Sequence, residues 1–428
     1  MALHAVVGIN WGDEGKGRMI DYLAQEADLV VRYQGGNNAG HTVINHLGTF
    51  KLRLIPSGIL NPGTVNVIGP GTVLDLESLD AELTELRKRG VDTSGLLLSE
   101  RATVCFPFHR DQDAWEEDRL ADQSYGSTRR GIAPVYGDRY LKKALQLGEL
   151  LDPDHLRGRL ADVVEWKNLA NRALYPGRPE ISLDAMTEWA LDYAERLRPH
   201  ICDVTPVLAE ADRAGRHVIF EAQLGALRDI LLGIYPYTTS SSSLAGYAPV
   251  GAGLPGRPLN LVTGVMKAFS TCVGEGPFVT EESGEWADLL RKSSGEYGVN
   301  TGRPRRIGHF DAVASRYGTL LQGADEIALT KLDSLSGQPV LRICTAYETD
   351  GTRSADFPMT HRLTRARPVY EDLPGWDEDL TGIRDFADLP AAAARYVLRI
   401  EELVGAPVRY VSVGPERDQL IDRGPGAR

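Results

Sequence analysis

The sequence predicts an α/β fold: a single large domain around a mostly parallel, helix-covered central sheet, with inserted helical and hairpin subdomains. Short apolar runs typical of strands alternate with stretches that repeat apolar residues at helical spacing, as in a parallel sheet with crossover helices. No Pro/Ser-rich linker, internal repeat or low-complexity tract divides the 428 residues. A glycine-rich turn between the first strand and the first helix adds a place for an anion at the sheet edge.

The elements follow the chain in order. Strands are expected at residues 4–9, 28–33, 64–68, 217–220, 326–330, 339–347 and 407–413. Helices are expected at residues 76–90, 183–198, 310–322 and 389–404. Residues 42–53 read as an antiparallel hairpin that turns near His46-Leu47-Gly48. We treat residues 1–428 as one domain, with a mainly helical inserted region at about 100–200.

Composition excludes several classes of partner. The 59 acidic residues outnumber 47 basic ones, and no basic stripe offsets the net charge of −12, so we expect no nucleic-acid partner. The four cysteines show no Cys-x-x-Cys spacing, which predicts reduced thiols and no structural zinc. The first strand begins by about residue 4, so we expect no signal peptide, and no apolar run approaches the ~20 residues of a membrane helix. We therefore expect a cytoplasmic protein with no membrane partner.

Residues 8–17 read Gly-Ile-Asn-Trp-Gly-Asp-Glu-Gly-Lys-Gly, between an apolar strand and a helical pattern. Glycines let backbone N–H groups converge on a phosphate, and the helix N-terminus adds a favourable dipole. Lys16 is placed to reach phosphate oxygens. The layout is P-loop-like, but it is not Walker A, because Gly17 stands where the magnesium-binding hydroxyl belongs. Asp13 lies inside the loop, where a carboxylate suits a metal or a proton transfer rather than a plain turn.

Residues 34–42, Gln-Gly-Gly-Asn-Asn-Ala-Gly-His-Thr, follow the second predicted strand. The carboxyl ends of parallel strands meet at one edge of a sheet, where ligands bind in open α/β folds. This arrangement puts His41 near Asp13. A lone loop histidine is usually a hydrogen-bonding group, but beside the first loop it is a candidate for catalysis.

At these two loops the chain resembles the adenylosuccinate synthetase family, which carries Trp-Gly-Asp-Glu-Gly-Lys-Gly near its start and Gly-Asn-Asn-Ala-Gly-His-Thr after its second strand. Further shared segments are residues 54–60, 235–237, 276–278, 301–303 and 330–333, in the same order. The resemblance therefore extends along nearly the whole chain.

Three later motifs are interpreted through this resemblance. Thr330-Lys331-Leu332-Asp333 follows a strand, and a carboxylate there can accept from both N1–H and the 2-amino group of guanine, which adenine lacks. Ser412-Val413-Gly414-Pro415 also follows a strand and resembles a second guanine-contacting loop. Residues 299–306 contain Arg303, Arg305 and Arg306, whose forks can clamp the two carboxylates of an aspartate. Pro304 stands where the family commonly has arginine.

The resemblance implies the following roles. Catalysis is assigned to Asp13, His41 and Lys16, and a magnesium ion to Asp13 and the Gly40 carbonyl. GTP binding is assigned to Gly12, Glu14, Gly15, Lys16, Gly17, Gly40, Thr42, Arg305, Lys331, Leu332, Asp333, Ser412 and Gly414. Aspartate binding is assigned to Val299, Asn300, Thr301, Arg303 and Arg305. The purine nucleotide is assigned to Asn38, Thr128, Arg129, Lys142, Gln223, Leu224, Thr239, Val273 and Arg303.

The implied reaction has two steps. Asp13 removes the N1 proton of IMP, and the 6-oxygen attacks the γ-phosphate of GTP to form a 6-phosphoryl intermediate. The amine of aspartate then displaces this phosphate, giving adenylosuccinate, GDP and phosphate. His41 donates to the transferring group. The resemblance also implies a homodimer in which Lys142 reaches the partner's nucleotide, with about residues 100–200 carrying part of that nucleotide site.

Departures from the family gather around the nucleotide monophosphate. The family's Thr-Thr-Gly-Arg-Gly-Ile-Gly-Pro is here Ser127-Thr128-Arg129-Arg130-Gly131-Ile132-Ala133-Pro134. Its Glu-Gly-Ala-Gln-Gly-Thr is Glu221-Ala222-Gln223-Leu224-Gly225-Ala226, so Leu224 replaces a purine-contacting glutamine unless a one-residue shift brings Gln223 into that role. Lys142 and Cys272 stand where the family commonly has arginine.

These changes leave alternatives open. One is the same ligation on a modified purine-like nucleotide of a specialised pathway. Another is a GTP-binding regulatory GTPase without ligation, although Arg303 and Arg305 argue against it, because a switch has no need of an aspartate clamp. A dinucleotide oxidoreductase is disfavoured, because residues 8–17 lack Gly-x-Gly-x-x-Gly.

Overall fold

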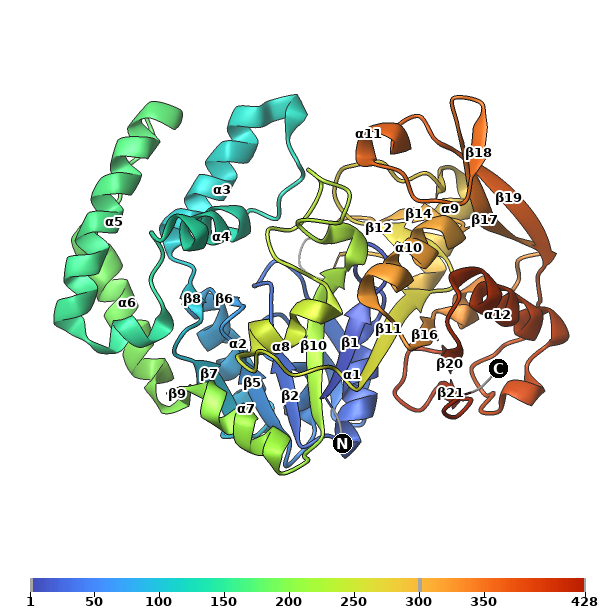
Figure 1. Cartoon of the computed structure of the whole chain (residues 1–428), viewed down its shortest axis with the longest axis horizontal. Coiled ribbons are helices and arrows are strands. Elements are labelled where there is room, and N and C mark those ends of the chain that lie inside the picture. Colours follow the sequence, from blue (N-terminus) through green and yellow to red (C-terminus); the bar gives the residue numbers. More distant parts are fainter. Residues whose placement is uncertain (1–2, 299–301, 427–428) are drawn as a thin grey trace.

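The structure, a computed structural model, describes residues 3–298 and 302–426. Its centre is a ten-stranded sheet, parallel throughout except for the antiparallel edge strand β21 (Figure 1). In spatial order the strands are β21 (Leu420–Asp422), β20 (Val408–Ser412), β16 (Glu326–Thr330), β11 (Leu261–Lys267), β1 (Leu3–Gly8), β10 (Val218–Gly225), β2 (Leu29–Arg32), β5 (Val65–Ile68), β7 (Leu96–Ser99) and β9 (Ile201–Cys202). The predicted α/β fold with a mostly parallel sheet is confirmed.

Helices cover both faces of this sheet, because its strands are apolar on both sides. Val6 of β1 packs with Met19 and Ile20 of α1 on one face, whereas its neighbours Ala5 and Val7 belong to the cluster formed with α7 and α8. The helices are α1 (Lys16–Leu23), α2 (Leu76–Lys88), α3 (Pro107–Leu120), α4 (Ile132–Leu141), α5 (Pro153–Leu174), α6 (Leu183–Leu197), α7 (Val204–Arg213), α8 (Ala248–Ala252), α9 (Glu285–Ser294), α10 (Ala312–Gln322), α11 (Thr360–Leu363) and α12 (Ala391–Val404).

The predicted helices form within a few residues of their expected bounds. In α2 the four spaced leucines are buried, and Asp75 caps the helix by accepting from the Ser78 N–H at 3.0 Å. Helices α3 to α6 stand together on one side of the molecule, away from the C-terminal part of the sheet (Figure 1). None of the described helices has both the length and the apolarity needed to cross a bilayer.

Smaller sheets flank the central one. The hairpin expected at 42–53 is β3 (His41–Asn45) with β4 (Gly48–Leu52), and β6 (Val73–Leu74) pairs with β8 (Thr103–Val104). A three-stranded sheet contains β12 (Ser270–Cys272), β14 (Arg306–Gly308) and β13 (Glu281–Glu282). A four-stranded sheet contains β15 (Phe310–Asp311), β17 (Val340–Thr349), β18 (Thr352–Ser354) and β19 (Arg367–Pro374).

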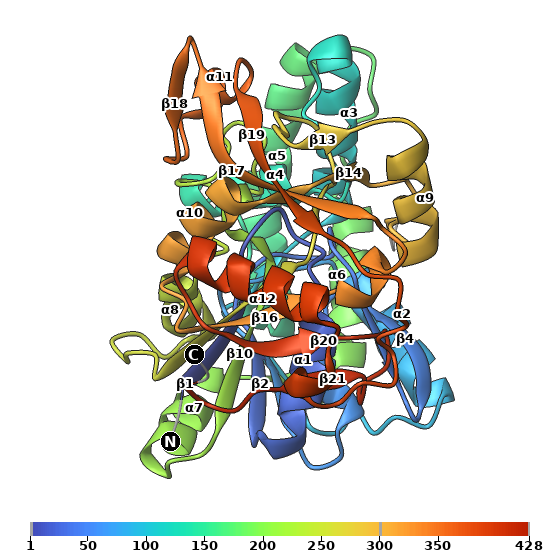
Figure 2. The same cartoon turned by 90° about the vertical axis from the view of Figure 1, so that its right-hand side faces the viewer.

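The strand expected at 339–347 is β17, but it lies outside the central sheet, on the side where β18 and β19 project (Figure 2). Exposed and buried residues largely alternate along β17, whereas β1 and β2 are buried at every position. A strand with one solvent-exposed face suits a sheet that is covered on one side only. The alternation in its sequence is therefore the signal that separates β17 from the central strands.

Candidate active site

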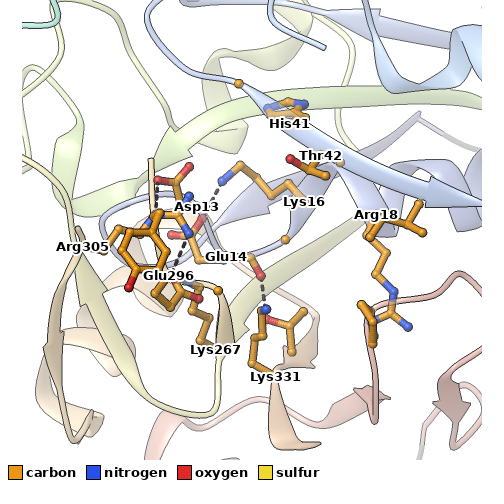
Figure 3. Close-up of a pocket in the computed structure, with 18 of the residues that line it drawn as sticks. Asp13, Glu14, Lys16, Arg18, His41, Thr42, Lys267, Glu296, Arg305 and Lys331 are labelled. Carbon is orange, nitrogen blue, oxygen red and sulfur yellow. Dashed lines mark hydrogen bonds and ion pairs between the residues drawn. The ribbon is translucent and has the colours of Figure 1, made fainter. Parts of the chain in front are cut away.

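A cavity of about 550 Å³ lies at the carboxyl ends of β1, β11, β16 and β20, the edge at which parallel sheets bind ligands. Most of the predicted catalytic and GTP-binding residues line it: Asp13, Glu14, Gly15, Lys16, Gly17, Gly40, His41, Thr42, Arg305, Lys331, Asp333, Ser412 and Gly414. Residues from distant parts of the sequence therefore share one space, as Figure 3 shows.

The Glu14 side chain holds the first glycine-rich loop in place through hydrogen bonds inside the loop. Its Oε1 accepts from the Gly12 N–H at 2.7 Å, and its Oε2 lies 2.5 Å from Lys16 Nζ, although both side chains are almost fully buried. The Glu14 carbonyl accepts from Thr330 Oγ1 at 2.6 Å, which ties the loop to the end of β16. The Glu14 carboxylate therefore holds the loop and pairs with Lys16.

The two glycine-rich loops touch at Gly17 and His41. A Cβ built on Gly17 would lie 2.7 Å from His41 Cβ, closer than real Cβ atoms approach other heavy atoms. His41 in turn places Nδ1 2.7 Å from Oε1 of Glu221, a residue in the middle of β10. Ser57 donates to the same carboxylate through Oγ and its backbone N–H, both at 2.7 Å.

Burial by itself raises the pKa of Glu221, but the His41 ring and the two Ser57 donors outweigh it and leave this pKa lowered. Glu221 is therefore an anion that fixes the orientation of His41. With Nδ1 held by Glu221, Nε2 is the ring nitrogen left for the cavity that His41 lines.

An ionic chain leads from Asp13 into the protein. Arg305 Nε lies 3.0 Å from Asp13 Oδ2, and Arg305 NH1 donates to Glu296 Oε2 at 2.6 Å. Lys267, at the end of β11, donates to the same oxygen at 2.7 Å. Burial works against the charge on Glu296, but Lys267, Arg305 and Lys331 lower its pKa to about 2. Burial, partly offset by Glu296, lowers the pKa of Lys267 to about 8.

Lys331 and Asp333 lie at the far end of the cavity from His41. Lys331 adopts φ 64° directly after β16 and donates to the Ser294 carbonyl at 2.7 Å. Among the described residues Asp333 Oδ1 is buried and has no hydrogen-bond partner. Burial raises the pKa of Asp333, with Lys331 and Arg18 opposing the shift. A buried, unpaired carboxylate oxygen is suited to a donor brought by a ligand.

Arg18 holds the second predicted guanine loop in place. Its guanidinium donates to Ser412 Oγ and to the carbonyls of Glu416 and Gln419, the latter at 2.7 and 2.8 Å. Leu332 is fully buried behind this end of the cavity and lies in the core. Arg18 could not be selected from the sequence, because its contacts are with a segment almost 400 residues away.

The structure shows which of the side chains of Gln223 and Leu224 faces the cavity. The Gln223 side chain is fully buried and bonds the backbone of Gly36 in both directions, at 3.0 Å each. Leu224 adopts φ 61° and lines the cavity beside Asp13. The amide of Gln223 is thus committed to the second glycine loop, and an apolar side chain faces the cavity.

The other residues predicted for the nucleotide lie outside this cavity. Thr128, Arg129 and Lys142 are exposed, and Arg129 pairs with Asp118 at 3.0 Å. Thr239 is buried, and within the described ranges neither its Oγ1 nor Asn38 Oδ1 has a hydrogen-bond partner.

Two further groups complete the comparison with the sequence. Val273 and Arg303 are exposed, and Val299, Asn300 and Thr301 lie outside the described residues. Lys267, Glu296 and Glu221 were not predicted. Lys267 and Glu221 are the charged residues of otherwise uncharged, buried strands, which is the signal that could have found them.

Comparison with known proteins agrees with this geometry. A family model described as adenylosuccinate synthetase matches residues 5–421. The chain is 50% identical over 419 residues to adenylosuccinate synthetase 2 of Pseudoalteromonas translucida, covering 98% of this chain and 99% of that protein. It is 47% identical over 422 residues to adenylosuccinate synthetase of Moorella thermoacetica, covering 98% and 99%.

A solved structure gives the same result in three dimensions. The fully ligated adenylosuccinate synthetase from Plasmodium falciparum superposes with a TM-score of 0.93 at 31% identity, covering 99% of this chain and all of that one. With matches over nearly its entire length, the chain belongs to the adenylosuccinate synthetase family, and it is a ligase that uses GTP.

Proposed function

We propose that this chain joins L-aspartate to C6 of IMP, with GTP as phosphoryl donor, and releases adenylosuccinate, GDP and phosphate. The observation that carries the proposal is the position of Asp13. Its carboxylate lines the cavity where the two glycine-rich loops meet, with His41 above it, Arg305 at one side and Lys331 below (Figure 3). The proposed base Asp13, the proposed acid His41 and the side chains proposed to bind the substrates thus line one cavity.

In the first step Asp13 accepts the N1 proton of the purine while the 6-oxygen attacks the γ-phosphate. The lactam N–H is a weak acid, so developing charge must be stabilised by fixed donors. With Nδ1 held by Glu221, His41 can donate from Nε2 to the transferring group when the ring carries both protons. Lys16 and the backbone N–H groups of the first loop supply fixed positive potential for the phosphates.

In the second step the amine of aspartate attacks C6, the C6–O bond breaks, and the phosphate departs with the former 6-oxygen. Arg305 is the cavity cation best placed to take a substrate carboxylate, since one edge of its fork already contacts the Asp13 carboxylate. Glu296 keeps the other edge of the fork in place during that exchange.

The residues present fit a magnesium ion. Magnesium prefers oxygen donors and usually takes one or two carboxylates, waters and substrate phosphates. Asp13 and the carbonyl of Gly40 line the cavity and are donors of this kind. When bound with GTP, the ion would neutralise charge that develops on the transferring phosphoryl group.

The Lys331–Asp333 end is our proposed guanine site. Asp333 Oδ1, a buried acceptor without a partner in the described chain, can take the N1–H or the 2-amino group of guanine. We also propose a cytoplasmic homodimer in which Lys142 reaches the partner's nucleotide. Exposed Tyr140 and Leu141 beside Lys142 support a protein contact there.

A product assay tests the reaction. Purified protein is given GTP, magnesium and aspartate with IMP, and GDP, phosphate and nucleotide products are quantified by chromatography. We expect equal amounts of GDP, phosphate and adenylosuccinate, and no turnover when aspartate or IMP is omitted. Phosphate release without aspartate and nucleotide would identify a GTPase, and turnover confined to purine analogues would identify a changed acceptor.

A further inference from the structure

Arg228 lies at the end of the short η6 turn (Ala226–Arg228) and is 8% exposed. Its NH1 donates to the Tyr237 and Glu275 carbonyls, and its NH2 donates to the Val273 carbonyl and contacts Cys272 Sγ at 3.0 Å. One buried guanidinium therefore bonds two segments that are far apart in the sequence. We call them the 237–239 segment and the 272–276 segment.

The 272–276 segment is held on its other side by Arg306. Arg306 NH1 donates to the Gly274 carbonyl at 3.2 Å and to the Gly276 carbonyl at 2.8 Å, while the rest of its fork pairs with Glu281. The carbonyls of residues 273 and 275 thus go to Arg228, and those of 274 and 276 go to Arg306. Two cations on alternate carbonyls fix the course of this short loop.

The 237–239 segment is fixed by the same residue through its backbone. The Thr239 N–H donates to the Arg228 carbonyl at 2.9 Å, so Arg228 contacts both ends of the segment. The segments also pack directly, since a Cβ on Gly276 would lie 2.7 Å from Cγ of the Tyr237 ring. Loss of the guanidinium would leave this packing without the hydrogen bonds that set its register.

The segment carries a polar atom that a ligand can satisfy. Thr239 is 8% exposed, and its Oγ1 is buried without a partner in the part of the chain described by the structure. A buried hydroxyl left unpaired is costly, and a bound nucleotide is a source of the missing partner. The position of this hydroxyl depends on Arg228, which bonds the Thr239 N–H through its carbonyl and the Tyr237 carbonyl through its guanidinium.

We propose that Arg228 is a positioning residue of the nucleotide pocket, whose guanidinium holds the 237–239 and 272–276 segments in register and so sets the affinity for the nucleotide monophosphate. The inference rests on the proposed function, because Thr239 and Val273 face the nucleotide only if the chain binds one. Lysine cannot replace Arg228, because one ammonium donates from a single point whereas the planar fork reaches acceptors on two segments.

The test compares Arg228→Met and Arg228→Lys with wild type. We expect KM and the calorimetric Kd for IMP to rise about tenfold in both variants, because a small misplacement of a binding group has effects of this order or larger. KM for GTP and for aspartate should stay within about twofold.

A rescue variant separates the guanidinium from the fold around position 228. Cys272 Sγ touches Arg228 NH2, so an arginine side chain starting at 272 begins where Arg228 ends. Arg228→Met combined with Cys272→Arg should recover most of the IMP affinity. A merely structural role predicts no recovery.

The matched control is Arg423→Met. The side chain of Arg423 is 8% exposed, pairs with Glu401 and donates to a carbonyl, that of Val408, each at 2.7 Å. This variant should lower Tm without changing KM for IMP. The inference is overturned if the Arg228 variants fold and bind IMP normally, or if the KM values of all three substrates rise together with a fall in Tm. If wild type forms no adenylosuccinate, the proposed function fails, whereas normal wild-type turnover with unaltered variants rejects the inference alone.

Discussion

The proposed GTP half and the proposed nucleotide half of the site are built differently. Glu14 lies in the loop after β1, Lys16 begins α1 and Lys331 follows β16, and all three have polar partners within the protein. Thr128 and Lys142 instead lie on exposed loops beside α4, outside the cavity. Side chains next to the central sheet are held in place by it, whereas loops on an inserted helical region tolerate changes of sequence. This contrast matches the sequence, whose departures from the family concentrate on the nucleotide.

The largest effect should come from Asp13→Asn, at the boundary between the two halves. The amide keeps the shape of the side chain but cannot accept the N1 proton, so kcat should fall by at least about 10²-fold. GTP binding measured by calorimetry should be retained within a few fold. If the Asp13→Asn enzyme is active, Asp13 is not the base that accepts the N1 proton.

Asp333→Asn tests whether the GTP half recognises guanine where we place it. Losing a charged acceptor should raise KM for GTP about ten- to a hundredfold. Xanthosine triphosphate should become the better donor, because the amide can donate to its 2-oxo group. Asp377→Asn, at an exposed position, is the control and should change neither KM. If the Asp333→Asn variant keeps GTP affinity within about twofold of wild type, the guanine ring binds elsewhere.

Leu224→Gln tests the nucleotide half. Because Leu224 lines the cavity, an amide there should raise kcat/KM for IMP by about tenfold if the family's purine contact is recovered. Gln223→Ala should lower stability instead, because it removes both bonds to Gly36. Leu231→Gln, at a residue 81% exposed, is the control. If Leu224→Gln leaves the kinetics for IMP unchanged, this side chain does not face the purine.

The smallest expected effect is the pH dependence of KM for GTP. Burial raises the pKa of Asp333, and only the carboxylate form accepts two guanine donors. KM for GTP should therefore rise severalfold as the pH falls through this raised pKa, at a higher pH than an ordinary aspartate requires. Asp333→Asn should show a flat profile over the same range, and an equal slope in that variant would assign the titration to another group.

Local signals in the sequence predicted the fold and the catalytic loops. Glycines at Gly12 and Gly15 provide the positive φ values of 105° and 99° that the first loop needs, and the strand ahead of it is buried throughout. Glu296 was not predicted, because its ion pair forms only when the loop after α9 lies against Lys267 of β11, 29 residues earlier in the chain. Such ionic chains depend on tertiary contacts, for which one sequence has no periodic signal.

The contact between Gly17 and His41 has a consequence for the robustness of the enzyme. The spacing between the start of α1 and His41 is set by van der Waals contact between Gly17 and the His41 side chain. Steric contact is insensitive to salt and to protonation, unlike the ion pairs of Arg305 and Lys16 nearby. The spacing between α1 and His41 should therefore persist when salt weakens those ion pairs, whereas the orientation of the His41 ring still depends on Glu221. A methyl group added at position 17 would break this contact.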